Sequence, residues 1–267
     1  MNVLFFGDIV GAQAAACVAE RLPSLRAELD VDLTIVNAEN CAESGLGMAR
    51  WQVEQLLQAG ADVITGGNHS WDTPESVELL ARERVIRPNN VGLDVPGRGI
   101  VCVAVGSQEI TVINLADFCS MKSVKITKDT FYPAHKSWCE SEKKGVVIVD
   151  YHGDHVLEKQ IFAHAVDGEA TAVIGTHTHE STLDLHILPH GTAFVTDAGM
   201  IGPGGGVQGF DPTFLVAGLK ANGDPFSGPM PAVRAGPITG HAILLEISGS
   251  RTKSVRRVSV VPGLAEL

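Results

Sequence analysis

The sequence predicts an α/β protein built on a parallel or mixed sheet that is covered by helices. Hydrophobic residues make up 45% of the 267 residues, enough for a sizeable core. Short apolar runs, typical of buried strands, alternate with longer segments rich in Ala, Leu, Glu and Arg, which favour helices. This strand–helix alternation is typical of parallel or mixed sheets. The predicted strands in the first part of the chain are 3–6, 33–37 and 63–65, and the helices are 12–29, 51–59 and a segment that begins at 73.

Residues with special backbone preferences mark the ends of these helices. Pro23 predicts a kink or break in the helix at 12–29, because proline cannot donate a hydrogen bond to the preceding turn. Gly60 is a favourable residue to close the second helix. Thr73 and Pro74 open the third helix as its N-cap and its first-turn residue.

The second part of the chain predicts more strands and more loop. Residues 117–144 are polar and mixed, and we interpret them as a surface excursion or a cap, whereas 199–237 carry many Gly and Pro and predict mostly loop. The remaining predicted elements are a hairpin at 100–105 and 110–115, strands at 146–151, 172–175, 184–188 and 193–196, a helix at 156–165, and a closing hairpin at 242–247 and 255–261. No linker separates two parts, so we expect one domain over 1–267.

Composition excludes several classes of function. A formal net charge of -11 argues against stable nucleic-acid binding through a basic face. Five cysteines without a CxxC pair predict neither a disulfide framework nor a zinc knuckle. The first residues lack the basic start of a signal peptide, and no apolar run is long enough to span a membrane. We therefore expect a cytoplasmic protein with reduced thiols.

Polar side chains gather where the predicted strands end. In open α/β sheets the carboxyl ends of the strands share one edge, where ligands bind. Any one of these residues alone is better explained as a turn former, a helix cap or a structural histidine. Because all of them are expected at the same edge of the sheet, a ligand-binding site is the better explanation for the group. The residues are Asp8, Glu39, Asn40, Asn68, His69, His152, His177 and His179.

The chemical types of these side chains predict a pair of metal ions. Carboxylates, an amide oxygen and imidazole nitrogens are the ligands that paired cations require. A single zinc ion would need only three or four of them. We expect His177 and His179 to project together, as alternate residues of an extended segment do.

The ordered motifs resemble those of calcineurin-like metallophosphoesterases, and most closely the YmdB-like bacterial branch. The resemblance covers nearly the whole chain. The motifs are GDIVG at 7–11, VNAEN at 36–40, GNHSWD at 67–72, a lone His152, GTHTH at 175–179 and TDAGMIGP at 196–203.

This resemblance implies a four-layer α/β/β/α sandwich with mixed sheets and a role for each site residue. One metal would be held by Asp8, Glu39, Asn40 and His179, and the other by Glu39, Asn68, His152 and His177, with Glu39 bridging. His69 would be the proton donor. The implied activity is that of a phosphodiesterase acting on cyclic nucleotides, 2′,3′-cyclic ones included, by attack of a metal-bridging hydroxide.

Two positions depart from the broader pattern. Val10 stands where most metallophosphoesterases have a histidine. The YmdB-like branch also lacks this histidine, so the resemblance implies an oxygen-richer shell for one metal. This favours iron or manganese over zinc, with magnesium also possible. The stretch 152–159 keeps His152 but differs around it, which affects substrate preference more than metal binding. We expect His155 to be an exposed residue at the start of a helix.

The same site residues are compatible with two alternative functions. A phosphomonoesterase or 5′-nucleotidase could use the same site, and a regulatory protein could hold the metals structurally. The expected partner is a small phosphate ester of nucleotide type, and a homo-oligomer is compatible with the sequence. Gly204, Gly206 and Gly209 match a dinucleotide-binding pattern, but no helix pattern follows them, which predicts a flexible loop near the site instead.

Overall fold

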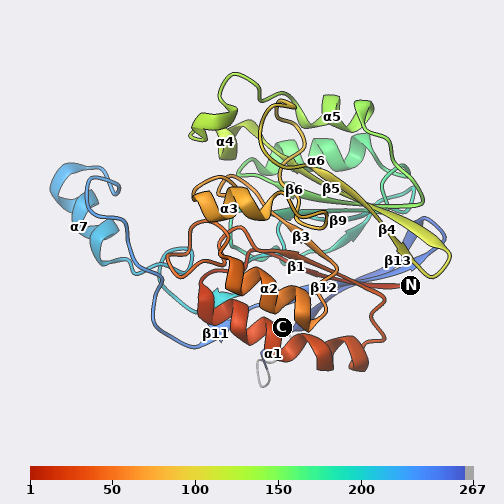
Figure 1. The fold of residues 1–267 in the computed structure, drawn as a ribbon, viewed down its shortest axis with the longest axis horizontal. Coiled ribbons are helices and arrows are strands. Elements are labelled where there is room, and N and C mark those ends of the chain that lie inside the picture. The colour runs from red at the N-terminus through yellow and green to blue at the C-terminus, as the bar shows by residue number, and fades with distance from the viewer. Residues whose placement is uncertain (262–267) are drawn as a thin grey trace.

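The computed structural model describes residues 1–261 and contains two mixed sheets that pack face to face (Figure 1). The first has the order β13-β12-β1-β2-β3. Strand β1 pairs in parallel with β2, which pairs in parallel with β3, whereas β12 is antiparallel to both β1 and β13. The bounds are β1 (Asn2–Phe6), β2 (Leu33–Asn37), β3 (Val63–Thr65), β12 (His241–Ser248) and β13 (Arg251–Ser259).

The second sheet has the order β4-β5-β6-β7-β9-β8. Its centre, from β5 through β6 and β7 to β9, is parallel, and the edge strands β4 and β8 are antiparallel to their neighbours. The bounds are β4 (Ile100–Val105), β5 (Gln108–Ala116), β6 (Val146–His152), β7 (Ala172–Thr176), β8 (His186–Ile187) and β9 (Ala193–Val195). A separate small ribbon pairs β10 (Gly202–Pro203) with β11 (Ile238–Thr239).

Alternation along β1 shows why the protein has four layers. Val3 and Phe5 face the second sheet, in a core that includes Ile148 of β6. Leu4 and Phe6 face the other way, toward helices α1 and α2. Because successive side chains of a strand point to opposite faces, one apolar strand can contribute to two cores. The order is therefore helix, sheet, sheet, helix, which confirms the predicted α/β/β/α sandwich.

Helices cover the outer face of each sheet (Figure 1). Helices α1 (Ala12–Glu28), α2 (Arg50–Ala59) and α3 (Pro74–Leu79) cover the first sheet. Helices α5 (Ala134–Glu140) and α6 (Val156–Ala165) cover the second, where Trp138 and Phe162 meet edge to face. The short α4 (Phe118–Met121) and a 3₁₀ turn at Lys125–Thr127 lie between them in sequence.

Three segments refine the local predictions, because the structure excludes a break at Pro23 and adds ordered elements to 117–144 and to the mostly looped 199–237. Helix α1 continues through Pro23, because burial of Leu22 and Leu25 on either side offsets the one hydrogen bond that proline removes. The segment 117–144 is more than a surface excursion, since Trp138 is part of a core. The glycine-rich stretch 199–237 contains helix α7 (Thr213–Asn222), which extends away from the sheets in Figure 1.

No helix within residues 1–261 combines the length and hydropathy needed to cross a membrane. The predicted domain 1–267 extends into residues 262–267, which lie outside the described residues.

Candidate metal centre

The carboxyl ends of five strands, three from one sheet and two from the other, deliver the predicted site residues. Strand β1 leads to Asp8, β2 to Glu39 and Asn40, and β3 to Asn68 and His69. Strand β6 ends at His152, and β7 leads to His177 and His179. The two sheets therefore both contribute to the site, which follows from their face-to-face packing.

The Nε2 atom of His152 lies at the centre of one group of ligand-type atoms. It is 2.8 Å from Asn68 Oδ1, 2.9 Å from His177 Nδ1 and 3.0 Å from Glu39 Oε1. Glu39, His152 and His177 each offer a ligand atom within 4.8 Å of the others. Two imidazole nitrogens, a carboxylate oxygen and an amide oxygen therefore converge on one small volume, which is a donor set suited to a transition-metal ion.

A second group lies beside the first, around Asp8. Its Oδ1 atom is 4.0 Å from both His152 Nδ1 and His179 Nε2, and its Oδ2 atom accepts a hydrogen bond from the backbone N–H of His177 at 2.9 Å. Asn40 donates from Nδ2 to the carbonyl of Gly45 at 2.7 Å, so its Oδ1 is left to face another partner. The two groups are therefore in contact, because Asp8 lies next to both His152 and His177 of the first group.

Three buried oxygens at this site make no hydrogen bond, although one of them, Glu39 Oε1, lies 3.0 Å from the imidazole Nε2 of His152. Among the described residues six buried side-chain atoms have no hydrogen-bond partner, and half of them are Asp8 Oδ1, Glu39 Oε1 and Asn40 Oδ1. A buried acceptor left unpaired costs about 1–3 kcal/mol. Bound cations would satisfy all three oxygens, so the residues present fit a metal centre.

The site also strongly perturbs the acidity of its own side chains. Burial alone would raise the pKa of Glu39, but the adjacent His152 outweighs this and lowers that pKa to about 2. Burial opposes the charged form of His152, yet Glu39 and Asp8 raise its pKa to about 9. Burial and the nearby His152 lower the pKa of His177 to about 4. Glu39 therefore stays ionised, which is the form in which a carboxylate can bind a metal ion.

The backbone is bent at both His177 and His179, which corrects the expectation of an extended segment. His177 has φ 97° and His179 has φ 65°, both in the left-handed region that non-glycine residues rarely occupy. Such strain persists only where surrounding contacts hold it. Here Asp8 accepts from the N–H of His177, and Asp197 accepts from the N–H of Thr178 at 3.1 Å.

Gly67 leaves the space in which the ligand atoms meet. A Cβ atom at this position would clash with both Glu39 Oε2 and His152 Nε2. Val10, where most metallophosphoesterases have a histidine, is fully buried and supplies no ligand.

His69 lies at the rim of the centre and has a carboxylate partner. Its Nδ1 atom is 2.6 Å from Asp72 Oδ2, and its backbone N–H donates to Glu39 Oε2 at 3.1 Å. Burial would lower the pKa of His69, but Asp72 and Glu39 raise it above the ordinary value. The side chain is 26% exposed, so it can meet a ligand that enters from solvent.

Known proteins share both this fold and these motifs. A family model described as YmdB-like protein matches residues 4–258. The chain belongs to the YmdB-like family. This confirms the resemblance predicted from its motifs.

Relatives in the YmdB-like family span the full fold. A 2′,3′-cyclic-nucleotide 2′-phosphodiesterase of Bacillus subtilis (strain 168) is 34% identical over 261 residues, covering 96% of this chain and 95% of the relative. The crystal structure of a hypothetical protein from Thermus thermophilus has a TM-score of 0.86 and 33% identity, covering 97% and 98% of the two chains. That of a novel phosphatase from Mycoplasma pneumoniae has a TM-score of 0.85 and 28% identity, covering 97% and 92%.

In this YmdB-like chain, residues that the sequence motifs do not indicate hold the candidate ligands in place. Asp150 accepts from Thr176 Oγ1 at 2.6 Å, and Thr176 Oγ1 lies 3.0 Å from His152 Nδ1. Asp154 Oδ1 lies 3.2 Å from His177 Nε2. Partners on the far nitrogen of a histidine fix its orientation. An aspartate inside the apolar run VVIVDYH was the available signal for Asp150.

Two further residues next to the site, Lys159 and Asp197, form a buried ion pair. Lys159 Nζ donates to the carbonyl of Thr176 at 2.8 Å and lies 3.0 Å from Asp197 Oδ2. Asp197 belongs to the TDAGMIGP motif at 196–203. His155 is exposed and caps helix α6, accepting from the N–H of Glu158 at 3.2 Å.

Proposed function

We propose that this protein is a metal-dependent phosphodiesterase that hydrolyses cyclic nucleotides, 2′,3′-cyclic ones included. The observation that carries the proposal is the convergence of carboxylate, amide and imidazole groups from five strand ends, with three buried oxygens that make no hydrogen bond. The activity named for the Bacillus subtilis relative supports the substrate class.

The proposed ligands divide into two sets that share Glu39. Asp8, Glu39, Asn40 and His179 would hold one metal ion, and Glu39, Asn68, His152 and His177 the other. The oxygen-rich first set, with Val10 in place of a histidine, favours iron or manganese. Bound at these positions, two cations would neutralise the phosphate oxygens and lower the pKa of a water molecule.

The chain itself supplies the proton for the leaving group in this proposal. Asp72 accepts from Nδ1 of His69, which leaves Nε2 as the nitrogen that can transfer a proton. The raised pKa of His69 favours its protonated form. His69 protonates the sugar oxygen as the P–O bond breaks, and the ester is hydrolysed without a covalent enzyme intermediate. A positioned proton donor is worth about 10²–10⁴-fold in rate.

A comparison of three substrates tests this proposal. Steady-state rates would be measured for 2′,3′-cyclic AMP, bis-p-nitrophenyl phosphate and p-nitrophenyl phosphate, on protein purified without chelators and assayed for metal content. We expect the cyclic nucleotide to have the highest kcat/KM and the monoester the lowest.

The opposite order would indicate a phosphomonoesterase or 5′-nucleotidase, an alternative that the Mycoplasma pneumoniae phosphatase supports. Two bound metals with no turnover of any ester would indicate a regulatory protein with a structural metal centre. Turnover that survives complete metal removal would contradict the metal-dependent mechanism.

A further inference from the structure

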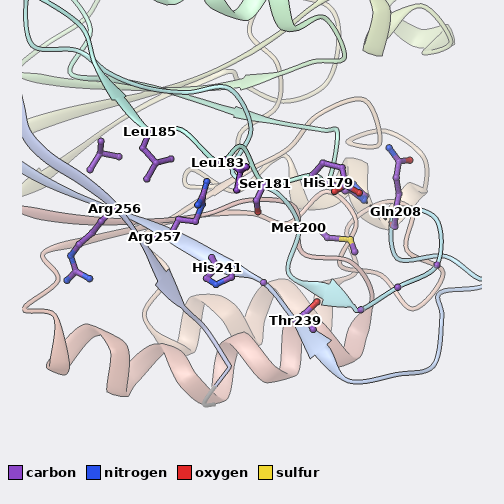
Figure 2. A pocket seen from close by; sticks show the side chains of 16 residues that line it. His179, Ser181, Leu183, Leu185, Met200, Gln208, Thr239, His241, Arg256 and Arg257 are labelled. Carbon is purple, nitrogen blue, oxygen red and sulfur yellow. Dashed lines mark hydrogen bonds between the residues drawn. The ribbon is translucent and has the colours of Figure 1, made fainter. Parts of the chain in front are cut away.

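A cavity opens beside the candidate metal centre. This cavity has a volume of about 670 Å³, within the range of small-molecule sites, and His179 forms part of its wall (Figure 2). It runs from His179 and Gln208 toward strand β13, where Arg256 and Arg257 line it. Because His179 borders both spaces, a ligand whose phosphate sits at the metal centre can extend into the cavity.

Arg257 brings an unpaired positive charge to this cavity. Its side chain lines the cavity, while its Nη2 atom is buried in the wall and has no hydrogen-bond partner among residues 1–261. Arginine is always charged, and a buried guanidinium donor without an acceptor is costly. Within the described chain, Glu180 at the His179 end is the single carboxylate lining the cavity.

The positive charge of Arg257 also acts on His241, which lies on the neighbouring strand. His241 lies on β12 and lines the cavity, and its pKa is lowered first by burial and then by the positive charge of Arg257. An anion that paired with Arg257 would weaken that repulsion. The charged end of the cavity is therefore positive, and it suits an anionic or strongly polar group.

The rest of the wall suits the apolar and neutral parts of a nucleotide. Leu183, Leu185 and Met200 supply apolar surface, with Leu185 at the arginine end and Met200 nearer Gln208 (Figure 2). The glycines at 204–206 also line the cavity and contribute backbone to its wall. A sugar and base could lie here while a second charged group reaches Arg257.

We propose that this cavity binds the part of the substrate remote from the scissile phosphate, and that Arg257 binds a second phosphate there. The inference rests on the proposed phosphodiesterase function and narrows its substrate class. The preferred substrates are nucleotides that carry a second phosphate, such as a 2′,3′-cyclic nucleotide phosphorylated at its 5′ oxygen. Arg257 acts as a specificity-determining residue and takes no part in bond breaking.

The test compares matched substrates with matched variants. Adenosine 2′,3′-cyclic phosphate would be assayed with and without a 5′-phosphate, beside bis-p-nitrophenyl phosphate, on the metal-loaded enzyme. The variant is Arg257→Gln, and Arg257→Lys retains the charge without the planar fork. Lys253→Gln is the control, because it removes the same charge from an exposed position on β13 that does not line the cavity.

The expected result is a selective loss. Arg257→Gln should lower kcat/KM for the 5′-phosphorylated substrate about 10- to 100-fold, mostly through KM, since a hydrogen bond to a charged group contributes about 1.5–3 kcal/mol. Arg257→Lys should lose less. The substrates without a second phosphate, the metal content and the Lys253→Gln control should stay near wild type.

Other outcomes overturn the proposal. No preference of the wild type for the 5′-phosphorylated substrate, or an equal loss on all three substrates, would remove the second-phosphate role of Arg257. If the wild type hydrolyses no diester, the proposed function fails instead. Arg257 is then tested by titrating adenosine 5′-monophosphate and adenosine into wild type and Arg257→Gln. Equal binding of both ligands by both proteins would reject the subsite.

Discussion

Lys159 Nζ lies 3.0 Å from Asp197 Oδ2, and both side chains are almost fully buried next to the loop that carries His177 and His179. Lys159 also donates to the carbonyl of Thr176, and Asp197 accepts from the N–H of Thr178. The ion pair therefore holds the backbone on both sides of His177. This explains how two histidines with left-handed backbone angles keep their places.

Removal of the lysine charge should damage both the fold and the metal centre. Lys159→Met leaves the Asp197 carboxylate buried and unpaired, which costs about 3–5 kcal/mol in the free energy of unfolding. Because the loop loses its anchor, metal occupancy should fall as well. Urea denaturation and metal analysis would measure the two effects.

Lys136→Met, which breaks an exposed pair with Glu140 at 3.9 Å, is the matched control and should behave like wild type. A Lys159→Met protein with unchanged stability and metal content would show that the pair does not support the site.

A methyl group at Gly67 should occupy the space that the metal ligands surround. Gly67→Ala would place a Cβ atom in steric conflict with Glu39 Oε2 and His152 Nε2. The ligands must then move, and we expect metal affinity and activity to fall about 10- to 100-fold, as when ligand orientation is disturbed elsewhere. Gly228→Ala is a control, because its nearest contact there is 3.7 Å. Full metal occupancy in Gly67→Ala, measured by elemental analysis, would contradict this arrangement of the centre.

Loss of His69 should separate catalysis from metal binding. His69→Ala should keep both metals and slow turnover about 10²–10⁴-fold on 2′,3′-cyclic nucleotides, whose ribose leaving group needs a proton. The loss should be smaller on p-nitrophenyl esters.

Asp72→Asn should give a weaker version of the same pattern, because it removes the carboxylate that orients the His69 ring through Nδ1. Values of kcat for both substrate types, with metal content, provide the measurement. An equal loss on both substrates would assign His69 to phosphate positioning, and a loss of metal would make it a ligand.

Much of this arrangement is readable from residue patterns alone. Apolar runs that end in Asp8, Asn68 or His152 predict strands whose carboxyl ends carry polar groups, because parallel strands present those ends at a shared edge. The mixture of carboxylate, amide and imidazole groups predicts a metal centre before any coordinates are known. These are local properties of short segments, and each motif carries its own signal.

The support of the site depends on contacts that no local pattern reveals. Lys159 on α6 looks like a surface residue in sequence, and only the packing of α6 over β7 and β9 brings it to Asp197. The bend at His177 and His179 likewise arises from bonds to Asp8 and Asp197, which are distant in sequence.

The sequence by itself determined the α/β class, the family and the set of side chains that reach one edge, since apolar periodicity and motif order are local. The tertiary structure decided which of those atoms meet, that two sheets rather than one supply them, and that Arg257 faces a cavity next to His179. The reason is physical: a buried charge or an unpaired oxygen is defined by what surrounds it, and its neighbours here come from segments far apart in the chain.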